Sequence, residues 1–512
     1  MNTGPQARDA AEARHLATDH LLGDLRGRTV SNGFVAAVAQ STEFAVTMGA
    51  AMVLARLLLP GDFGRVAIVT AIIGILRIIP DAGLSTATIQ RERITHAQVS
   101  NLFWANLAFS ALASLIVAAC APVVAWVYGD PSLLGITLTL AITFVLNGLG
   151  VQHLALLNRQ LRMKAIAIIR VGSVVSGVSL GIAMACLDCG YWSLVGAQLA
   201  TPLSALLLTW QASRWRPQRP ARSGETRSML GFGANVTAST FIYSLARATD
   251  GLLIGKWYGS DAVGLYSRAS LLTRPVDQLA LPVSAVLVPV LSRLQEQPDR
   301  YRRMFLQVHD AISVVGFLFN ALLLPLAHPL TLVMLGPRWE SAANIVAGFT
   351  LASLFLPLFC TSSMLFASQG RGADWLRASS GISVLTLASF VIGLPFGPAG
   401  VALLYSLTGV LIELPFLYYV AGRQGPVSAR DLWLGFVRHV PLWGVVFGAT
   451  WLMRSVLVEL GSLAQLAVCI PFGLLAGAVF AALFAPARRT LLNVLEMLSV
   501  LRGAAVRSAG RS

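Results

Sequence analysis

The chain has 512 residues, and its formal net charge at neutral pH is +15. Hydrophobic residues make up 56% of the chain and charged residues 12%, about half the charged share of a typical soluble domain. A chain this apolar cannot cover a water-exposed surface with polar groups, so a soluble globular protein is excluded. The basic residues lie in small clusters between apolar runs, a pattern that indicates membrane topology and not a nucleic-acid interface.

The first 29 residues are polar and lack the apolar core of a signal peptide. We therefore expect a cytosolic tail, with a short interfacial helix around residues 16–25. Long apolar runs such as 108–127 and 440–451 follow, without the alternation that the strands of a membrane barrel require. Because backbone in lipid must satisfy its own hydrogen bonds, these runs predict helices.

Windows of about 19 residues define fourteen apolar segments. They cover residues 31–57, 64–87, 98–126, 133–156, 165–187, 190–212, 229–257, 262–291, 306–329, 342–368, 374–395, 398–421, 433–455 and 460–484. The sequence therefore predicts an all-α polytopic membrane protein with about 14 transmembrane helices.

The distribution of Lys and Arg predicts the orientation. With the N-terminus inside, 28 of the 38 basic residues fall on inner segments, five on outer segments and five within spans. This asymmetry predicts a multi-pass protein of the bacterial inner membrane with cytoplasmic N- and C-termini. It also predicts an even number of spans, since one missed helix would invert every later loop.

A weak internal repeat divides the chain. Arg56 and Gly64 are matched about 200 residues later by Lys256 and Gly264. We expect two parallel six-helix lobes, with a cleft between them that opens alternately to either side. The expected parts are an N-terminal tail (1–29), an N-lobe (30–213), a basic linker (214–228), a C-lobe (229–422), an appended helix pair (423–485) and a basic cytoplasmic tail (486–512).

Several arginines lie inside the predicted spans, where each charge costs roughly 2.5–3.5 kcal/mol. Arg170 and Arg268 have no acidic partner at helical spacing, so they are candidates to line a wet cavity. Arg77, Arg247 and Arg274 each have an aspartate three or four residues away, and either local pairing or a role in substrate binding fits them. Because the planar guanidinium suits phosphate oxygens, these five arginines are the predicted binding residues for an anionic headgroup.

Three acidic residues within spans, Glu43, Asp250 and Glu413, are candidates for ion coupling if transport uses an ion gradient. Asp310 is expected to be interfacial, and His309 and His328 are expected to lie at helix ends. We find no phosphate-binding loop, no HExxH or GxSxG motif and no metal-ligand cluster. The sequence thus predicts a carrier and no enzyme, without a cofactor or a metal.

Several stretches carry a resemblance to a known family. They are residues 54–67 (LARLLLPGDFGRVA), 81–91 (DAGLSTATIQR), 102–106, 190–195, 245–255 (LARATDGLLIG), 264–269 and 291–295. In combination they resemble the Wzx-like bacterial polysaccharide transporter family of the multidrug/oligosaccharidyl-lipid/polysaccharide exporter superfamily. The colanic-acid and succinoglycan exporter branch is the most similar. The likeness covers about residues 30–420.

The resemblance implies a fold of two helical lobes similar to that of the MATE (multidrug and toxin extrusion) transporters. It also implies a flippase that moves undecaprenyl-diphosphate-linked oligosaccharide repeat units to the outer leaflet. Membrane lipids, a polymerase and export machinery would be further partners, and nucleic acid would not. Three alternatives stay open: a multidrug antiporter of the same superfamily, a lipid II flippase, and a membrane polysaccharide polymerase.

Overall fold

The computed structural model describes residues 25–77, 94–220, 226–273 and 277–484, together with the single residues 85, 88, 89, 275 and 488. Every long element in these ranges is a helix, and they contain no strand. The predicted interfacial helix and nearly all of both predicted tails lie outside the described residues.

The contacts divide the chain into two compact units, Met1–Ala248 with Gly503–Ser512 and Thr249–Arg502. The division falls inside the long helix α9 (Thr226–Thr273). The expected linker at 214–228 and the other domain boundaries stay predictions.

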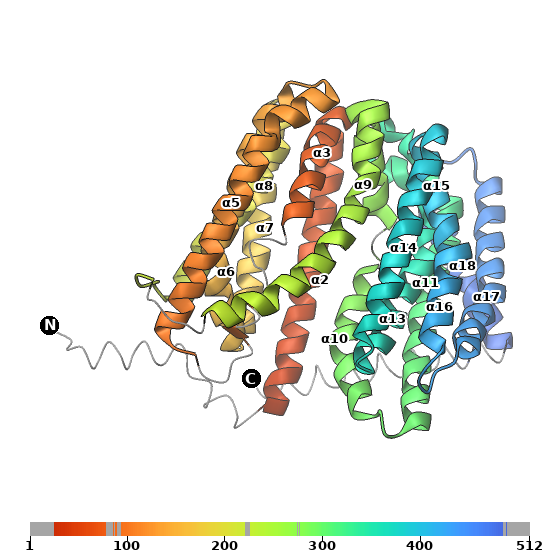
Figure 1. The fold of residues 1–512 in the computed structure, drawn as a ribbon. Coiled ribbons are helices and arrows are strands. Elements are labelled where there is room, and N and C mark those ends of the chain that lie inside the picture. The colour runs from red at the N-terminus through yellow and green to blue at the C-terminus, as the bar shows by residue number, and fades with distance from the viewer. Residues whose placement is uncertain are drawn as a thin grey trace. The chain divides into compact units, whose positions relative to one another are not determined.

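The first unit is a bundle of long helices that pack side by side (Figure 1). Before α9 it contains α2 (Leu25–Leu57), α3 (Pro60–Leu76), α5 (His96–Tyr128), α6 (Ser132–Arg159), α7 (Met163–Cys186) and α8 (Trp192–Ser213). The helices α5 and α6 form one hairpin and α7 and α8 another, while α2 packs on α7 and α6 on α8.

Two glycines allow α7 and α8 to approach closely. Gly177 and Gly181 lie four residues apart on α7, on the face that packs against α8. A Cβ atom at Gly177 would stand 2.7 Å from the carbonyl oxygen of Ala197, and one at Gly181 would stand 3.2 Å from that of Ser193. Small residues at this spacing let membrane helices gain van der Waals contact where no hydrophobic driving force exists between them.

The second unit contains the rest of α9 and the helices that follow. These are α10 (Asp277–Arg293), α11 (Pro298–Leu335), α12 (Ala342–Thr350), α13 (Ala352–Ser368), α14 (Gly372–Gly393), α15 (Gly397–Thr408), the π-helix η5 (Gly409–Glu413), α16 (Leu414–Gly422), α17 (Ala429–Val456) and α18 (Ser462–Leu483). Two short 3₁₀ turns, η3 (Pro337–Trp339) and η4 (Leu394–Phe396), link neighbouring helices.

α9 reverses direction at Gly259, where the backbone has a φ of 80° and leaves the helical region. The hydroxyl of Tyr266 donates a 3.0 Å hydrogen bond to Asp250, 16 residues earlier. In a straight helix 16 residues would rise about 24 Å, so the chain must fold back between them. The predicted seventh and eighth spans are therefore two helical arms joined at a glycine that adopts a positive φ.

α11 is a long, largely buried helix of the second unit and packs against α12, α13, α17 and α18. Its contacts with α17 form a ladder of side-chain hydrogen bonds. The ladder joins Arg302 to Asp431, Asp310 to Arg438, Asn320 to Trp443 and the Pro325 carbonyl to Arg454. The partners are separated by 129, 128, 123 and 129 residues, which only two helices running in the same direction allow. The topology predicts this direction, because α11 and α17 are the ninth and thirteenth spans.

The predicted spans are confirmed as helices wherever the structure describes them. Within the described residues nine helices are long and apolar enough to cross a membrane, or ten if the bent pair α12 and α13 counts as one span. One of the nine, Gly372–Gly422, covers two predicted spans. Large apolar side chains such as Trp126, Ile168 and Leu475 are exposed on these helices, as expected for a surface that faces lipid. The chain is a multi-pass membrane protein.

An ion pair secures the turn between α5 and α6. The Nε of Arg65 on α3 lies 2.9 Å from an Asp130 oxygen, and Ser132 donates two hydrogen bonds to the other oxygen. Burial opposes ionisation of this carboxyl. The hydrogen bonds from Ser132 and Arg65 outweigh burial and lower the pKa of Asp130 below its usual value.

We predict that this pair makes the first unit acid-sensitive. A lowered pKa in the folded state contributes stability that is present above the unfolded pKa, about 3.9, and that is lost as the pH falls through the folded value. When the pH is lowered below about 4, the temperature of half-unfolding should therefore decrease in the native protein. The decrease should be smaller in Asp130→Asn. Asp188→Asn, a change of an exposed carboxylate in the turn before α8, is the control and should behave like the native protein. An equal fall in all three proteins would contradict the prediction.

Arg371 connects the turn between α13 and α14 to the end of α16. It lies in the turn between α13 and α14, with its side chain 10% exposed. Its guanidinium donates to the carbonyl oxygens of Val420, Ala421 and Gln424 at the end of α16, and also to Gln369 and Asp374. The last carbonyls of a helix lack partners within it, and a cation there also interacts favourably with the helix dipole.

We predict that Arg371→Ala destabilises the second unit by roughly 2–4 kcal/mol, since it removes the donor that satisfies the partly buried carbonyls of Val420 and Ala421. Arg377→Ala provides the matched control, because Arg377 is on the same helix but its side chain is 82% exposed. Thermal unfolding of both variants in one detergent measures the difference. Equal midpoints for the two variants would show that Arg371 has no such role.

Candidate functional site

Arg170 is an exposed cation within the apolar stretch of α7. It is the eighth residue of this helix, and no ion pair of its side chain occurs among the described residues. The buried side of α7 is formed by small and apolar residues, among them Ile169, Ser173 and Gly177. Arg170 therefore points away from the packed interior of its own unit, as expected for a residue that lines a water-filled passage.

The other predicted site residues of the first unit whose side chains the structure describes are not buried in its core. Arg77 is exposed at the C-terminal cap of α3. Glu43 is half-buried on α2, the helix that packs against α7. The side chain of Arg247 lies outside the described residues, and so does Arg274.

Asp250 and Arg268 belong to the two arms of α9 within the second unit. Asp250 is half-buried and accepts hydrogen bonds from the Tyr266 hydroxyl at 3.0 Å and from the amide of Gly251 at 2.6 Å. Arg268 is half-buried on the same arm as Tyr266. The turn at Gly259 thus brings Asp250 close to the arm that carries Arg268, although the two are 18 residues apart in sequence.

Glu413 is the most deeply buried of the three predicted acidic residues, with 2% of its surface exposed. It ends the π-helix η5 and accepts a 2.6 Å hydrogen bond from the Thr386 hydroxyl of α14. Pro415 follows two residues later and cannot donate the N–H that an α-helix needs at that position, so a local rearrangement there is expected. Wide turns of this kind are frequent at functional sites.

The expectation that His309 lies at a helix end was wrong, whereas the interfacial position expected for Asp310 stays a prediction. His309 is 1% exposed and lies well inside α11, and Asp310 pairs with Arg438 at 2.9 Å. The sequence could not show this, because the partner of Asp310 is 128 residues away. His328 is exposed, and its Nε2 lies 3.2 Å from a carboxylate oxygen of Glu340.

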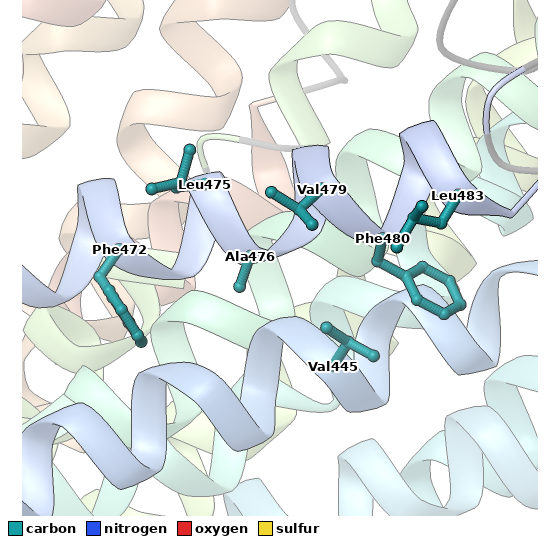
Figure 2. Close-up of a pocket in the computed structure, with 7 residues that line it drawn as sticks. All are labelled: Val445, Phe472, Leu475, Ala476, Val479, Phe480 and Leu483. Carbon is teal, nitrogen blue, oxygen red and sulfur yellow. The ribbon is translucent and has the colours of Figure 1, made fainter.

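An apolar groove of about 430 Å³ runs along α18 (Figure 2). It is lined by Val445 of α17 and by Phe472, Leu475, Ala476, Val479, Phe480 and Leu483 of α18. No lining side chain carries a polar group, so this groove can accommodate hydrocarbon but cannot bind a charged headgroup. Among the described residues no group of three or more His, Cys, Asp or Glu side chains could hold a metal ion.

Residues 53–344 match the family described as "Polysaccharide biosynthesis protein", and the matched region is more than half of the chain. The chain belongs to this family. The resemblance to the Wzx-like transporters is confirmed by the same match and by the relatives below.

Two members of known polysaccharide pathways are similar to this chain over most of its length. The lipopolysaccharide biosynthesis protein WzxC of Escherichia coli is 23% identical over 429 residues, which is 81% of this chain and 86% of that protein. The succinoglycan biosynthesis transport protein ExoT of Rhizobium meliloti is 24% identical over 322 residues, 63% of this chain and 65% of that protein.

Solved structures confirm the predicted fold. The lipid II flippase MurJ in an inward closed conformation superposes with a TM-score of 0.70 at 12% identity, covering 88% of this chain and 99% of that one. An inward-facing multidrug transporter of the MATE family superposes with a TM-score of 0.56 at 14% identity, covering 80% and 98%. At this level of identity the likeness shows the fold alone.

We predict that the passage side of α7 can be identified by chemical labelling. In a background without the five native cysteines, Arg170→Cys should react with a charged, membrane-impermeant thiol reagent, because the thiol ionises only in contact with water. Ile168→Cys is the matched control. Ile168 is 68% exposed and lies two residues away, almost on the opposite side of the helix, so it should face lipid and stay unlabelled. Labelling of residue 168 but not 170 would place Arg170 outside any wet passage.

Proposed function

We propose that this protein is a flippase for undecaprenyl-diphosphate-linked oligosaccharide repeat units of a lipopolysaccharide or exopolysaccharide. It would move them from the inner to the outer leaflet of the bacterial inner membrane, with both of its termini in the cytoplasm. It would act as a carrier and not as an enzyme, through alternating access of two lobes. A polymerase and export machinery would take over its product.

The family match carries this proposal. A protein of polysaccharide biosynthesis that consists of membrane-spanning helices is suited to moving an intermediate across the membrane, and one relative is named a transport protein. The fold shared with a lipid II flippase supports the same mechanism. A lipid-linked sugar diphosphate needs a protein to cross the membrane, because charged phosphates and unsatisfied hydroxyls cost many kcal/mol in hydrocarbon.

The cation-rich spans favour an anionic substrate over the cationic compounds that a multidrug antiporter exports. We propose that Arg170 and Arg268 attract the diphosphate or acidic sugars, together with Arg77, Arg247 and Arg274. The exposure of Arg170 on an apolar helix supports its part in this set. Among the three acidic candidates, we propose Glu413 as the residue that couples transport to an ion gradient. It is the most buried of the three, and burial makes the balance between the charged and the neutral carboxyl depend most strongly on the surrounding groups.

Reconstitution tests the proposed activity. The purified protein in liposomes should move a short-chain polyprenyl-diphosphate oligosaccharide with a fluorescent sugar to the outer leaflet, where an impermeant quencher reaches it. Protein-free liposomes and a cationic dye serve as controls. Quenching no faster than in protein-free liposomes, or transport of the dye alone, would overturn the proposal.

We predict that Arg170→Gln and Arg268→Gln each lower translocation roughly tenfold or more, since a charge-assisted hydrogen bond contributes roughly 1.5–3 kcal/mol. Arg377→Gln changes an exposed arginine outside the proposed set and should leave the rate unchanged. Polymer output in cells at matched protein level gives a second measurement. If both variants transport normally, the arginines do not bind the headgroup, even where the activity itself is confirmed.

A further inference from the structure

A cluster of buried titratable side chains lies where α17 packs on α11, and the proposed transport function does not use it. His439 of α17 has no exposed surface. Its Nε2 lies 3.3 Å from one carboxylate oxygen of Asp310 on α11, and the other oxygen accepts a 2.9 Å hydrogen bond from Arg438. Gly435 packs beside this contact, and a Cβ atom there would lie in van der Waals contact, 3.4 Å, with both Asp310 and His309.

The two buried histidines of the cluster differ in their surroundings. His309 has a hydroxyl beside each ring nitrogen, Thr361 at 2.8 Å and Tyr418 at 3.3 Å. Since hydroxyls both donate and accept, His309 keeps its hydrogen bonds in either protonation state. His439 is different, because its Nδ1 is buried with no hydrogen-bond partner in the part of the chain that the structure describes. Its ring packs near Phe317, with the centroids 5.9 Å apart.

The charged and titratable groups around His439 come from four helices. The helices that pack against α17 are α11, α16 and α18. Asp310 and His309 face His439 from α11, and Tyr418 of α16 reaches it through His309. α18 carries no charged residue, and its single titratable group is Cys469. The remaining groups on these helices are Asp299, Arg300, Tyr301, Arg302, Arg303, His328, Tyr419, Arg430, Asp431, Arg438 and Arg454.

We propose that His439 is a proton-binding site, and that binding of a proton weakens the packing of α17 on α11. Arg438 already balances the charge of Asp310, so a proton on His439 leaves the buried cluster with a net positive charge. The new N–H at Nδ1 also lacks an acceptor. Both effects favour a state in which α17 has moved and the ring of His439 contacts water.

Arg438 and Asp310 form the exposed edge of the cluster. The side chains of Arg438 and Asp310 are 44% and 17% exposed, whereas that of His439 is fully buried. A proton therefore reaches His439 past the carboxylate of Asp310. Because α18 packs on α17, the site links local pH to the position of α17 and α18. This property goes beyond the proposed transport.

Hydrogen exchange of the full-length protein in nanodiscs tests this inference. After correction for intrinsic rates, the amides of α17 should exchange roughly tenfold faster at about pH 5.5 than at about pH 8, the range over which histidine changes charge. His439→Gln keeps a hydrogen-bonding group near Asp310 but cannot titrate, so it should show no such difference. His328→Gln is the matched control. It removes an exposed histidine from α11 and should retain the full effect.

Two results would overturn the proposal: equal or slower exchange of α17 at the lower pH in the native protein, or an unchanged pH effect in His439→Gln. If His439→Gln does not fold, His439→Asn takes its place, and the native measurement decides by itself whether the effect exists. The experiment needs no substrate, so its failure is distinct from a failure of the transport proposal.

Discussion

A polar or charged group inside a lipid-embedded helix needs a partner or water, and this constraint organises the second unit. The long helix α11 meets α17 through hydrogen bonds at four depths, from Arg302 to Pro325. Arg371 satisfies the carbonyls at the end of α16, and Thr386 donates to the buried Glu413. Hydrocarbon offers no driving force for helices to associate, so such contacts, with close van der Waals packing, determine which helices are neighbours.

The position of the spans could be predicted from the sequence because it follows from a local property. Their orientation in the membrane stays a prediction. Hydropathy over about 19 residues locates a span, and the charge of the flanking loops orients it. The helical arms that meet at Gly259 were predicted as separate spans for the same reason, and the backbone leaves the helical region between them.

The partners of the buried charges could not be predicted, because helical spacing reveals only neighbours three or four residues away. Asp310 binds two residues of α17, 128 and 129 positions later, and no helical spacing could indicate them. His309 was expected at a helix end and lies among hydroxyls in the core. For the candidate site, the sequence identified Arg170 and Glu413 as unusual. Only the structure distinguishes them, since Arg170 is exposed and Glu413 is buried.

The near-constant offset between the partners on α11 and α17 has a consequence for how this protein can evolve. Inserting one residue into an α-helix rotates everything beyond it by about 100°, which would turn each later donor away from its acceptor. A change of length between residues 302 and 325 would therefore have to be matched by the same change between 431 and 454. The register of these two segments, far apart in the sequence, therefore couples their lengths to each other.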